Sequence, residues 1–273
     1  MNPKRLTLIL AALGAITAVA VIISQLNSIP QIEGFRYTGR GAGGALEYTH
    51  EATELEFVFL KGGEFLMGSP ESEAGRQNSE TQHRVTLSPF LIAKYEVKRE
   101  IFINVMNMSA KQRPPGIPAS GVSWDSAKGF CDRTGLELPT EAQWEYACRA
   151  GTTTATYAKA DTSKSDGGLG EIAWYGVFRG GKVQPVGTKK PNTWGIHDML
   201  GNVMEWCQDW YGDYPKDPVV DPRGPETGVA RVTRGGSFNV TADACRSAGR
   251  AASTPQFGDT RFGFRPAKSL QER

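Results

Sequence analysis

The stretch that decides the fold is Arg231-Val-Thr-Arg-Gly-Gly-Ser-Phe-Asn-Val-Thr-Ala-Asp-Ala-Cys245-Arg-Ser-Ala-Gly-Arg250. Its first four residues are typical of a short strand, and the glycine pair that follows predicts a turn. The glycines belong to no Gly-x-x-x-x-Gly-Lys-Ser/Thr pattern, so they do not predict a phosphate-binding loop. The stretch therefore predicts a strand that turns into a segment carrying a single cysteine, Cys245.

Composition limits the classes of protein to which the chain can belong. Of its 273 residues 39% are hydrophobic, which is ample for a buried core, and 32 glycines and 16 prolines suit a loop-rich fold. The 31 basic and 29 acidic residues leave a net charge of +2. This balance gives no electrostatic reason to expect a nucleic-acid partner.

The first 26 residues predict export. Lys4 and Arg5 precede an uncharged apolar run from Leu6 to Ile23, which is the pattern of a signal anchor or of a signal peptide. The run is about long enough to span a membrane, whereas Ala18-Val19-Ala20 offers a cleavage site. We therefore expect a single-pass membrane protein with its domain outside the cytoplasm, or a secreted or periplasmic protein if the segment is cleaved.

The rest of the chain predicts one domain. Residues 27–52 are rich in glycine and lack a sustained period, so they are expected to form a flexible linker. Residues 53–270 are expected to form a single compact, loop-rich α+β domain. Strands are predicted at 56–60, 64–67, 83–87, 90–95, 231–234 and 262–265, and helices at 98–106, after the N-cap Ser123, and after the capping box of Thr140 and Gln143.

Two kinds of site can be judged from residue counts alone. Four cysteines in an oxidising compartment allow up to two disulfides in three pairings, and the absence of Cys-x-x-Cys argues against a zinc ribbon or a thioredoxin-type motif. The chain has three histidines, none beside a nucleophile elbow, which argues against a Ser-His-Asp triad. The cysteines are Cys131, Cys148, Cys207 and Cys245, and the histidines are His50, His83 and His197.

Further motifs occur in a fixed order along the chain: Gly62–Ser69, Val122–Ala127, Leu138–Ala147, Pro185–Gly187, Pro191–Gly195, Asp198–Trp206 and Gly263–Arg265. Together with residues 231–250 they resemble the formylglycine-generating enzyme family, also called sulfatase-modifying factors. The resemblance covers about 210 of the 273 residues. It implies an α+β fold related to C-type lectin domains, with little regular structure and with bound calcium.

The resemblance also locates a remnant of the family's active site. Oxidising members hold copper(I) between two cysteine thiolates five residues apart, because soft sulfur ligands suit that ion. Cys245 stands at the second of these positions, but Val240 stands at the first. Ser237 matches a serine of the family's substrate groove. We therefore expect no copper and no catalytic residue, only a remnant site at Ser237 and Cys245.

A calcium site is expected in the turn at Gly201–Glu205. Asn202 can offer a side-chain carbonyl, Val203 a backbone carbonyl and Glu205 a carboxylate, and the family uses the Asn and the Glu of this motif in that way. The residues alone also allow another interpretation, in which Asn202 caps a turn and Glu205 pairs with an arginine.

The same comparison gives expectations for the cysteines and for three arginines. A Cys207–Cys245 disulfide would tie the predicted calcium turn to the remnant site. Cys131 and Cys148 match helix cysteines whose partner positions here are Arg250 and Pro266, so both are expected to be free and buried. Arg246, Arg250 and Arg265 are expected to build hydrogen-bond networks beneath the groove.

These observations lead to two hypotheses about function. The first is an exported or membrane-anchored, non-oxidising and calcium-stabilised module that binds a protein, a peptide or a carbohydrate. The alternative is a formylglycine-generating oxidoreductase that converts a sulfatase cysteine to formylglycine and needs copper.

Overall fold

The computed structural model describes residues 29–109, 114–163, 167–176 and 181–270. The predicted signal segment, residues 1–26, lies outside the described residues. Within the described ranges, no helix combines the length and the apolar character that crossing a membrane requires.

Three sheets form the framework, and each mixes strands from distant parts of the chain. The first has the order β1-β2-β3-β6-β12, the second β10-β9-β7-β11 and the third β4-β5-β8. Two pairings are parallel, β7 with β11 and β5 with β8. The strands are β1 (Phe35–Arg40), β2 (Leu46–His50), β3 (Glu56–Leu60), β4 (Gly63–Met67), β5 (His83–Leu87), β6 (Phe90–Ala93), β7 (Met204–Trp210), β8 (Val219–Val220), β9 (Arg231–Arg234), β10 (Arg250–Ser253), β11 (Phe262–Gly263) and β12 (Ala267–Ser269).

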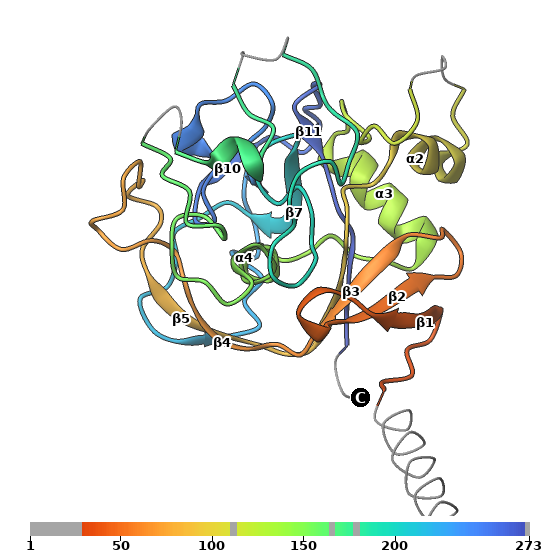
Figure 1. Ribbon diagram of the computed structural model, residues 1–273, viewed down its shortest axis with the longest axis horizontal. Coiled ribbons are helices and arrows are strands. Elements are labelled where there is room, and N and C mark those ends of the chain that lie inside the picture. The colour runs from red at the N-terminus through yellow and green to blue at the C-terminus, as the bar shows by residue number, and fades with distance from the viewer. Residues whose placement is uncertain (1–28, 110–113, 164–166, 177–180, 271–273) are drawn as a thin grey trace, which may run out of the picture.

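The described residues include three α-helices, which lie among the sheets: α2 (Arg99–Met106), α3 (Trp124–Thr134) and α4 (Glu141–Arg149). Figure 1 places α4 near the centre of the domain, with α2 and α3 together at one side. Short 3-10 turns occur at Ala42–Gly44, Leu169–Glu171 and Ala242–Ala244. The α+β class expected from the sequence is confirmed, with more strand than helix.

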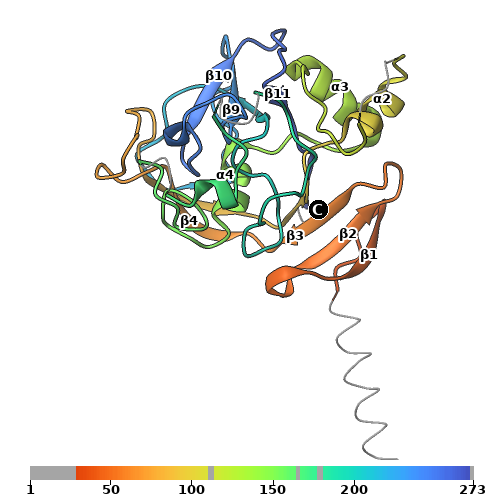
Figure 2. The same cartoon turned by 45° about the horizontal axis from the view of Figure 1, so that its top comes forward.

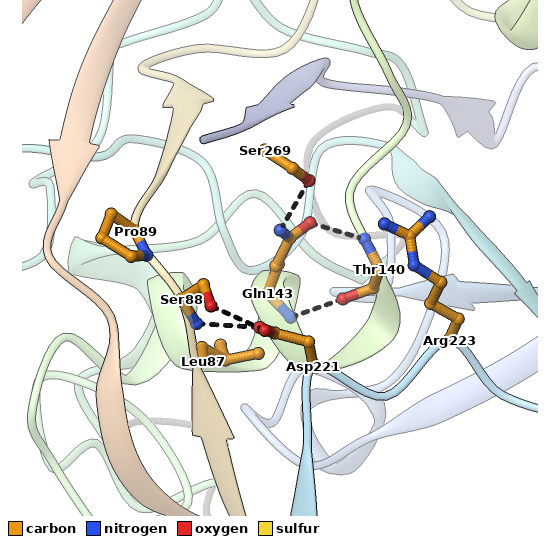
Figure 3. Close-up of a pocket in the computed structure, with 8 residues that line it drawn as sticks. All are labelled: Leu87, Ser88, Pro89, Thr140, Gln143, Asp221, Arg223 and Ser269. Carbon is orange, nitrogen blue, oxygen red and sulfur yellow. Dashed lines mark hydrogen bonds between the residues drawn. The ribbon is translucent and has the colours of Figure 1, made fainter. Parts of the chain in front are cut away.

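Local sequence explains where α3 and α4 begin. Ser123 Oγ accepts a hydrogen bond from Ser126 N, and Gly135 ends α3 in a left-handed conformation. In α4, Thr140 Oγ1 accepts from Gln143 N while Gln143 Oε1 accepts from Thr140 N (Figure 3). This is the predicted capping box, and it satisfies two backbone donors at once.

The prediction of a flexible linker is wrong for residues 35–50. They form β1 and β2, which extend the sheet from β3, as Figure 2 shows. Phe35 and Tyr48 are buried, and Tyr48 Oη donates to Pro30 O at 2.8 Å. The glycines do not make this segment flexible, because its aromatic side chains pack into the hydrophobic core that contains Phe57.

The centre of the domain is unusual in holding several buried ion pairs beside apolar residues. Trp144 and Trp206 are both fully buried, and so are the guanidinium groups of Arg234, Arg246 and Arg265. Buried charges are tolerated where they are paired and hydrogen-bonded. Arg234 and Arg250 connect the segment that the sequence singled out to Glu145 and Glu141 of α4, and Arg265 pairs with Glu205 of β7.

Candidate functional site

The glycine pair after β9 shapes the candidate site. Gly235 and Gly236 have φ of 90° and 72°, in the left-handed region that favours glycine. A Cβ placed on Gly236 would lie 2.8 Å from Cys245 Sγ and 3.1 Å from Val240 Cγ2. The turn therefore needs glycine, and it places Val240 and Cys245 side by side over the same backbone atom.

The Cys245 thiol is not a reactive group in this setting. The side chain is fully buried, and burial, followed by the charge of Asp243, raises its pKa to about 12. The thiol is therefore protonated at neutral pH, whereas metal binding and nucleophilic attack require the thiolate. Ser237 is also fully buried, and its hydroxyl accepts a hydrogen bond from Asn239 N at 3.4 Å.

The residues at this site do not fit a copper(I) ion held by two thiolates. The position beside Cys245 carries the aliphatic side chain of Val240, which offers no ligand atom. Cys207 does not replace the missing ligand, because it lies on β7 and has different neighbours. The charged groups that act most strongly on its thiol are Asp209, Glu141 and Arg234.

The predicted calcium turn does lie next to this segment. Gly201 N donates to Gly235 O at 2.8 Å, and Phe238 N donates to Asn202 O at 2.8 Å. Two motifs that lie more than thirty residues apart in the sequence thus form one unit through backbone hydrogen bonds.

The side chains of that turn have protein partners. Asn202 Oδ1 accepts from Gln184 N, and Asn202 Nδ2 donates to Glu96 Oε2 at 2.6 Å. Glu205 Oε2 accepts from Trp144 Nε1 and from Arg265 Nε, and Glu205 Oε1 accepts from Arg265 Nη2. Glu205 therefore pairs with an arginine, and a calcium ion would have to displace Arg265 or Trp144. In this arrangement the predicted ligands do not fit a calcium ion.

Two carboxyl groups near this turn were not recognised from the sequence. Glu96 is 1% exposed and accepts from Asn202 Nδ2 and from Val203 N. Asp198 is 1% exposed, and burial raises its pKa to about 6, while Gly187 N donates to its Oδ2. Burial, with the charges of Asp198 and Glu205, raises the pKa of Glu96 well above its ordinary value. Nothing local marks Glu96, because its partners lie more than 100 residues away.

The predicted arginine networks are present. Arg246 donates to Glu73, to both oxygens of Glu80 and to Gly75 O, and so fastens the long loop between β4 and β5. Arg250 pairs with both oxygens of Glu141 at the start of α4. Arg265 holds Glu205 and also donates to Ala93 O and His197 O.

All four cysteines lie in the described residues and all are free and buried. The prediction of a Cys207–Cys245 disulfide is therefore wrong for this structure. The two thiols have different surroundings, since Cys245 lies against Gly236 and Val240 while Cys207 lies near Glu141 and Arg234. The expectation that Cys131 and Cys148 are free and buried is confirmed.

Fold and site together define a loop-rich α+β domain whose central segment is a glycine turn over one buried cysteine. The chain belongs to the sulfatase-modifying factor enzyme 1-like family, whose model matches residues 44–270.

Individual relatives agree with this assignment. The formylglycine-generating enzyme of Thermomonospora curvata is 31% identical in an alignment that covers 77% of this chain and 92% of that protein. The serine/threonine-protein kinase pkn1 of Chlamydia caviae is 32% identical in an alignment that covers 79% of this chain but only 38% of the relative. Among solved structures, PvdO from Pseudomonas aeruginosa is 27% identical with a TM-score of 0.72, covering 85% of this chain and 100% of PvdO.

Proposed function

We propose that this chain is a non-oxidising member of the family, which presents its domain outside the cytoplasm as a binding module for a protein, a peptide or a carbohydrate. One observation carries the proposal: Val240 and Cys245 both lie against Gly236, and Val240 stands where a second thiolate would be needed. The lectin-like character implied by the sequence resemblance belongs to the same proposal. Calcium is left out of it, since Glu205 is bonded to Arg265.

The charge state of the remaining cysteine supports the proposal. A thiol with a pKa of about 12 is protonated at neutral pH, so neither copper binding nor nucleophilic chemistry is favoured at Cys245. Ser237 is buried as well, so neither side chain of the remnant site is exposed.

The alternative is a formylglycine-generating oxidoreductase, and it is favoured by the similarity to the Thermomonospora curvata enzyme along 92% of that protein's length. The two hypotheses differ in one measurable step, the oxidation of a peptide cysteine in the presence of copper.

The test combines the purified protein with copper(I), oxygen and a Cys-x-Pro-x-Arg peptide, and uses mass spectrometry to find formylglycine. We expect no product from the wild type. The matched variant is Val240→Cys, which places a second sulfur beside Cys245 and is expected to bind one copper(I) ion per chain. Turnover by the wild type that disappears in Cys245→Ser would overturn the proposal.

A further inference from the structure

A cavity of about 530 Å³ lies between the start of α4 and residues 209–225. This volume is within the usual range of small-molecule sites, roughly 300–1,000 Å³. Its lining includes an aliphatic wall of Val219, Val220 and Pro222 and the carboxyl groups of Asp209 and Glu141. Except for Arg250, no residue of the stretch 231–250 lines it, so the cavity is separate from the remnant site.

Asp209 is a buried carboxyl group of the cavity that forms no direct ion pair among the described residues, although the charges of Arg231 and Arg250 act on it. Its side chain is at the end of β7 and is 4% exposed. Its Oδ2 accepts from Glu141 N at 2.9 Å, but no lysine, arginine or histidine of the described ranges forms an ion pair with it. Burial and the charge of Glu141 raise its pKa to about 7. A buried carboxylate without a cation costs free energy, so an arriving cation would be favoured here.

Arg250 is not available to an anionic ligand. Arg250 donates from Nε and Nη2 to the two oxygens of Glu141, and from Nη1 to Ser79 O and Gly212 O. Its guanidinium also lies over the rings of Tyr211 and Tyr214, 4.5 and 3.9 Å from their centroids. This cation is therefore occupied on its edges and over its faces.

The aliphatic wall is held in place independently of any ligand. Asp221 accepts hydrogen bonds from Ser88 N and Ser88 Oγ at 2.8 and 2.7 Å, as Figure 3 shows, and β8 pairs with β5. The hollow drawn in Figure 3 has a volume of only about 10 Å³, room for about one water molecule. Arg223 borders both spaces, so residues 219–223 form a fixed partition between them.

We propose that this cavity binds a small organic cation, a primary ammonium or guanidinium group on an aliphatic stem. The charged head pairs with Asp209, and the stem lies along Val219 and Val220. The inference goes beyond the proposed function and does not depend on it, because it uses none of the residues around Cys245.

The experiment compares three probes of equal length that differ in charge: pentylamine, pentanol and pentanoate. Their binding to the full chain, kept in solution with a mild non-ionic detergent, is measured by titration calorimetry at pH 8. Pentylamine is expected to bind at least ten-fold more tightly than pentanol, because a charge-assisted hydrogen bond is stronger than a neutral one. Pentanoate is expected to bind more weakly still, since it would face Asp209 as a like charge. Equal affinity for the three probes would overturn the proposal.

Variants locate the binding. Asp209→Asn keeps an oxygen for Glu141 N–H and is expected to lower pentylamine affinity at least ten-fold while leaving pentanol unchanged. The matched control is Asp217→Asn, an exposed residue of the loop that follows β7, which does not line the cavity. Val219→Trp, which fills the cavity from its aliphatic wall, is expected to weaken both probes. Pentylamine binding that survives both Asp209→Asn and Val219→Trp would place the ligand elsewhere and overturn the proposal.

Proton release gives an independent readout. Asp209 is partly protonated near pH 7, so binding an ammonium group is expected to expel a proton and to weaken as pH falls from 8 to 6. The calorimetric heat at pH 7 then depends on the ionisation enthalpy of the buffer, and this dependence is lost in Asp209→Asn. Other charged or titratable groups near Asp209 can contribute to this pH dependence, which is why Asp209→Asn is the control. They are Glu141, Cys207, Arg231 and Arg250 on the surrounding elements, and His83, Asp213, Tyr214 and Arg223 in the cavity lining.

The same head group can come from a free amine or from a lysine side chain of a peptide. Nα-acetyl-lysine methylamide presents the ammonium as a peptide does. Tighter binding of this probe than of pentylamine would assign the cavity to a peptide's lysine, and weaker binding would assign it to a free amine. Failure of all the amines to bind would overturn the proposal while leaving the formylglycine test of the proposed function unaffected.

Discussion

Arg246 offers the sharpest test of how buried charge holds this fold together. Its side chain and that of Glu80 are both fully buried, and the two share hydrogen bonds of 2.8 and 2.7 Å. Further bonds of 2.7 Å reach Glu73 and Gly75 O. Arg246→Met keeps the aliphatic stem but removes all of these bonds and leaves Glu80 without a counter-charge.

The expected loss follows from the cost of breaking a buried pair, about 3–5 kcal/mol. This is a large part of the roughly 5–15 kcal/mol that a domain has in total. Glu80→Gln in the same background removes the stranded charge, so the double variant is expected to lose about 2 kcal/mol less than the sum of the two single variants. Urea unfolding at pH 7, followed by tryptophan fluorescence and by circular dichroism, measures all four proteins.

The dependence on pH has a definite sign. Burial opposes ionisation of Glu80, but hydrogen bonds from Arg246 and Ser69 hold its pKa below the ordinary value of 4.5. A lowered carboxyl pKa gives stability that is complete above the unfolded pKa and is lost as pH falls through the folded one. The difference between wild type and Arg246→Met should therefore shrink below about pH 4. A loss under about 1 kcal/mol at pH 7, or a difference that does not shrink in acid, would refute the reasoning.

Three further outcomes are expected. Burial raises the pKa of Asp198 from 3.8 to about 6, so the folded state binds a proton on this carboxyl group more tightly than the unfolded state does. The free energy of unfolding should therefore fall by about 3 kcal/mol as pH rises from about 4 to 6. Asp198→Asn should flatten this slope when urea unfolding is measured at each pH. Protein prepared without reductant and unfolded in guanidinium should show four titratable thiols, whereas two would restore the Cys207–Cys245 disulfide. Calcium chelation should leave the melting temperature unchanged because Glu205 is bonded to Arg265, and a fall of several degrees would show that an ion displaces that arginine.

The elements that could be predicted are those whose information is local. The N-cap Ser123 and the capping box of Thr140 and Gln143 satisfy their own helix ends, so a few adjacent residues specify each one. The strand at residues 231–234 is likewise marked by the glycines that follow it.

Strand β7 was not predicted, because its first residues were assigned to a turn. Glu205, Trp206 and Cys207 are all buried, so no alternation of polar and apolar residues marks them. The strand forms because β9 and β11 lie on either side of it, and neither neighbour can be seen in the local sequence.

At the candidate site, the resemblance to the family identified Val240 and Cys245 as a pair, and both side chains lie against Gly236. It could not reveal that Glu205 would bond to Arg265, since the two are 60 residues apart. Glu96 was missed for the same reason. Residues whose partners are distant in sequence carry no local signal.

The pairing of β1 with β2 also limits how far the domain can lie from the N-terminal segment. A flexible coil of 26 residues, the length of the linker predicted at 27–52, would let its two ends separate by about 30 Å on average. Instead Ile29 is buried and Pro30 O is bonded to Tyr48, so the domain begins where that tether was expected to start. If the N-terminal segment is an uncleaved anchor, which is one of the two expectations from the sequence, the domain would stay close to the lipid surface. Its partners would then have to come to the membrane rather than be sought at a distance from it.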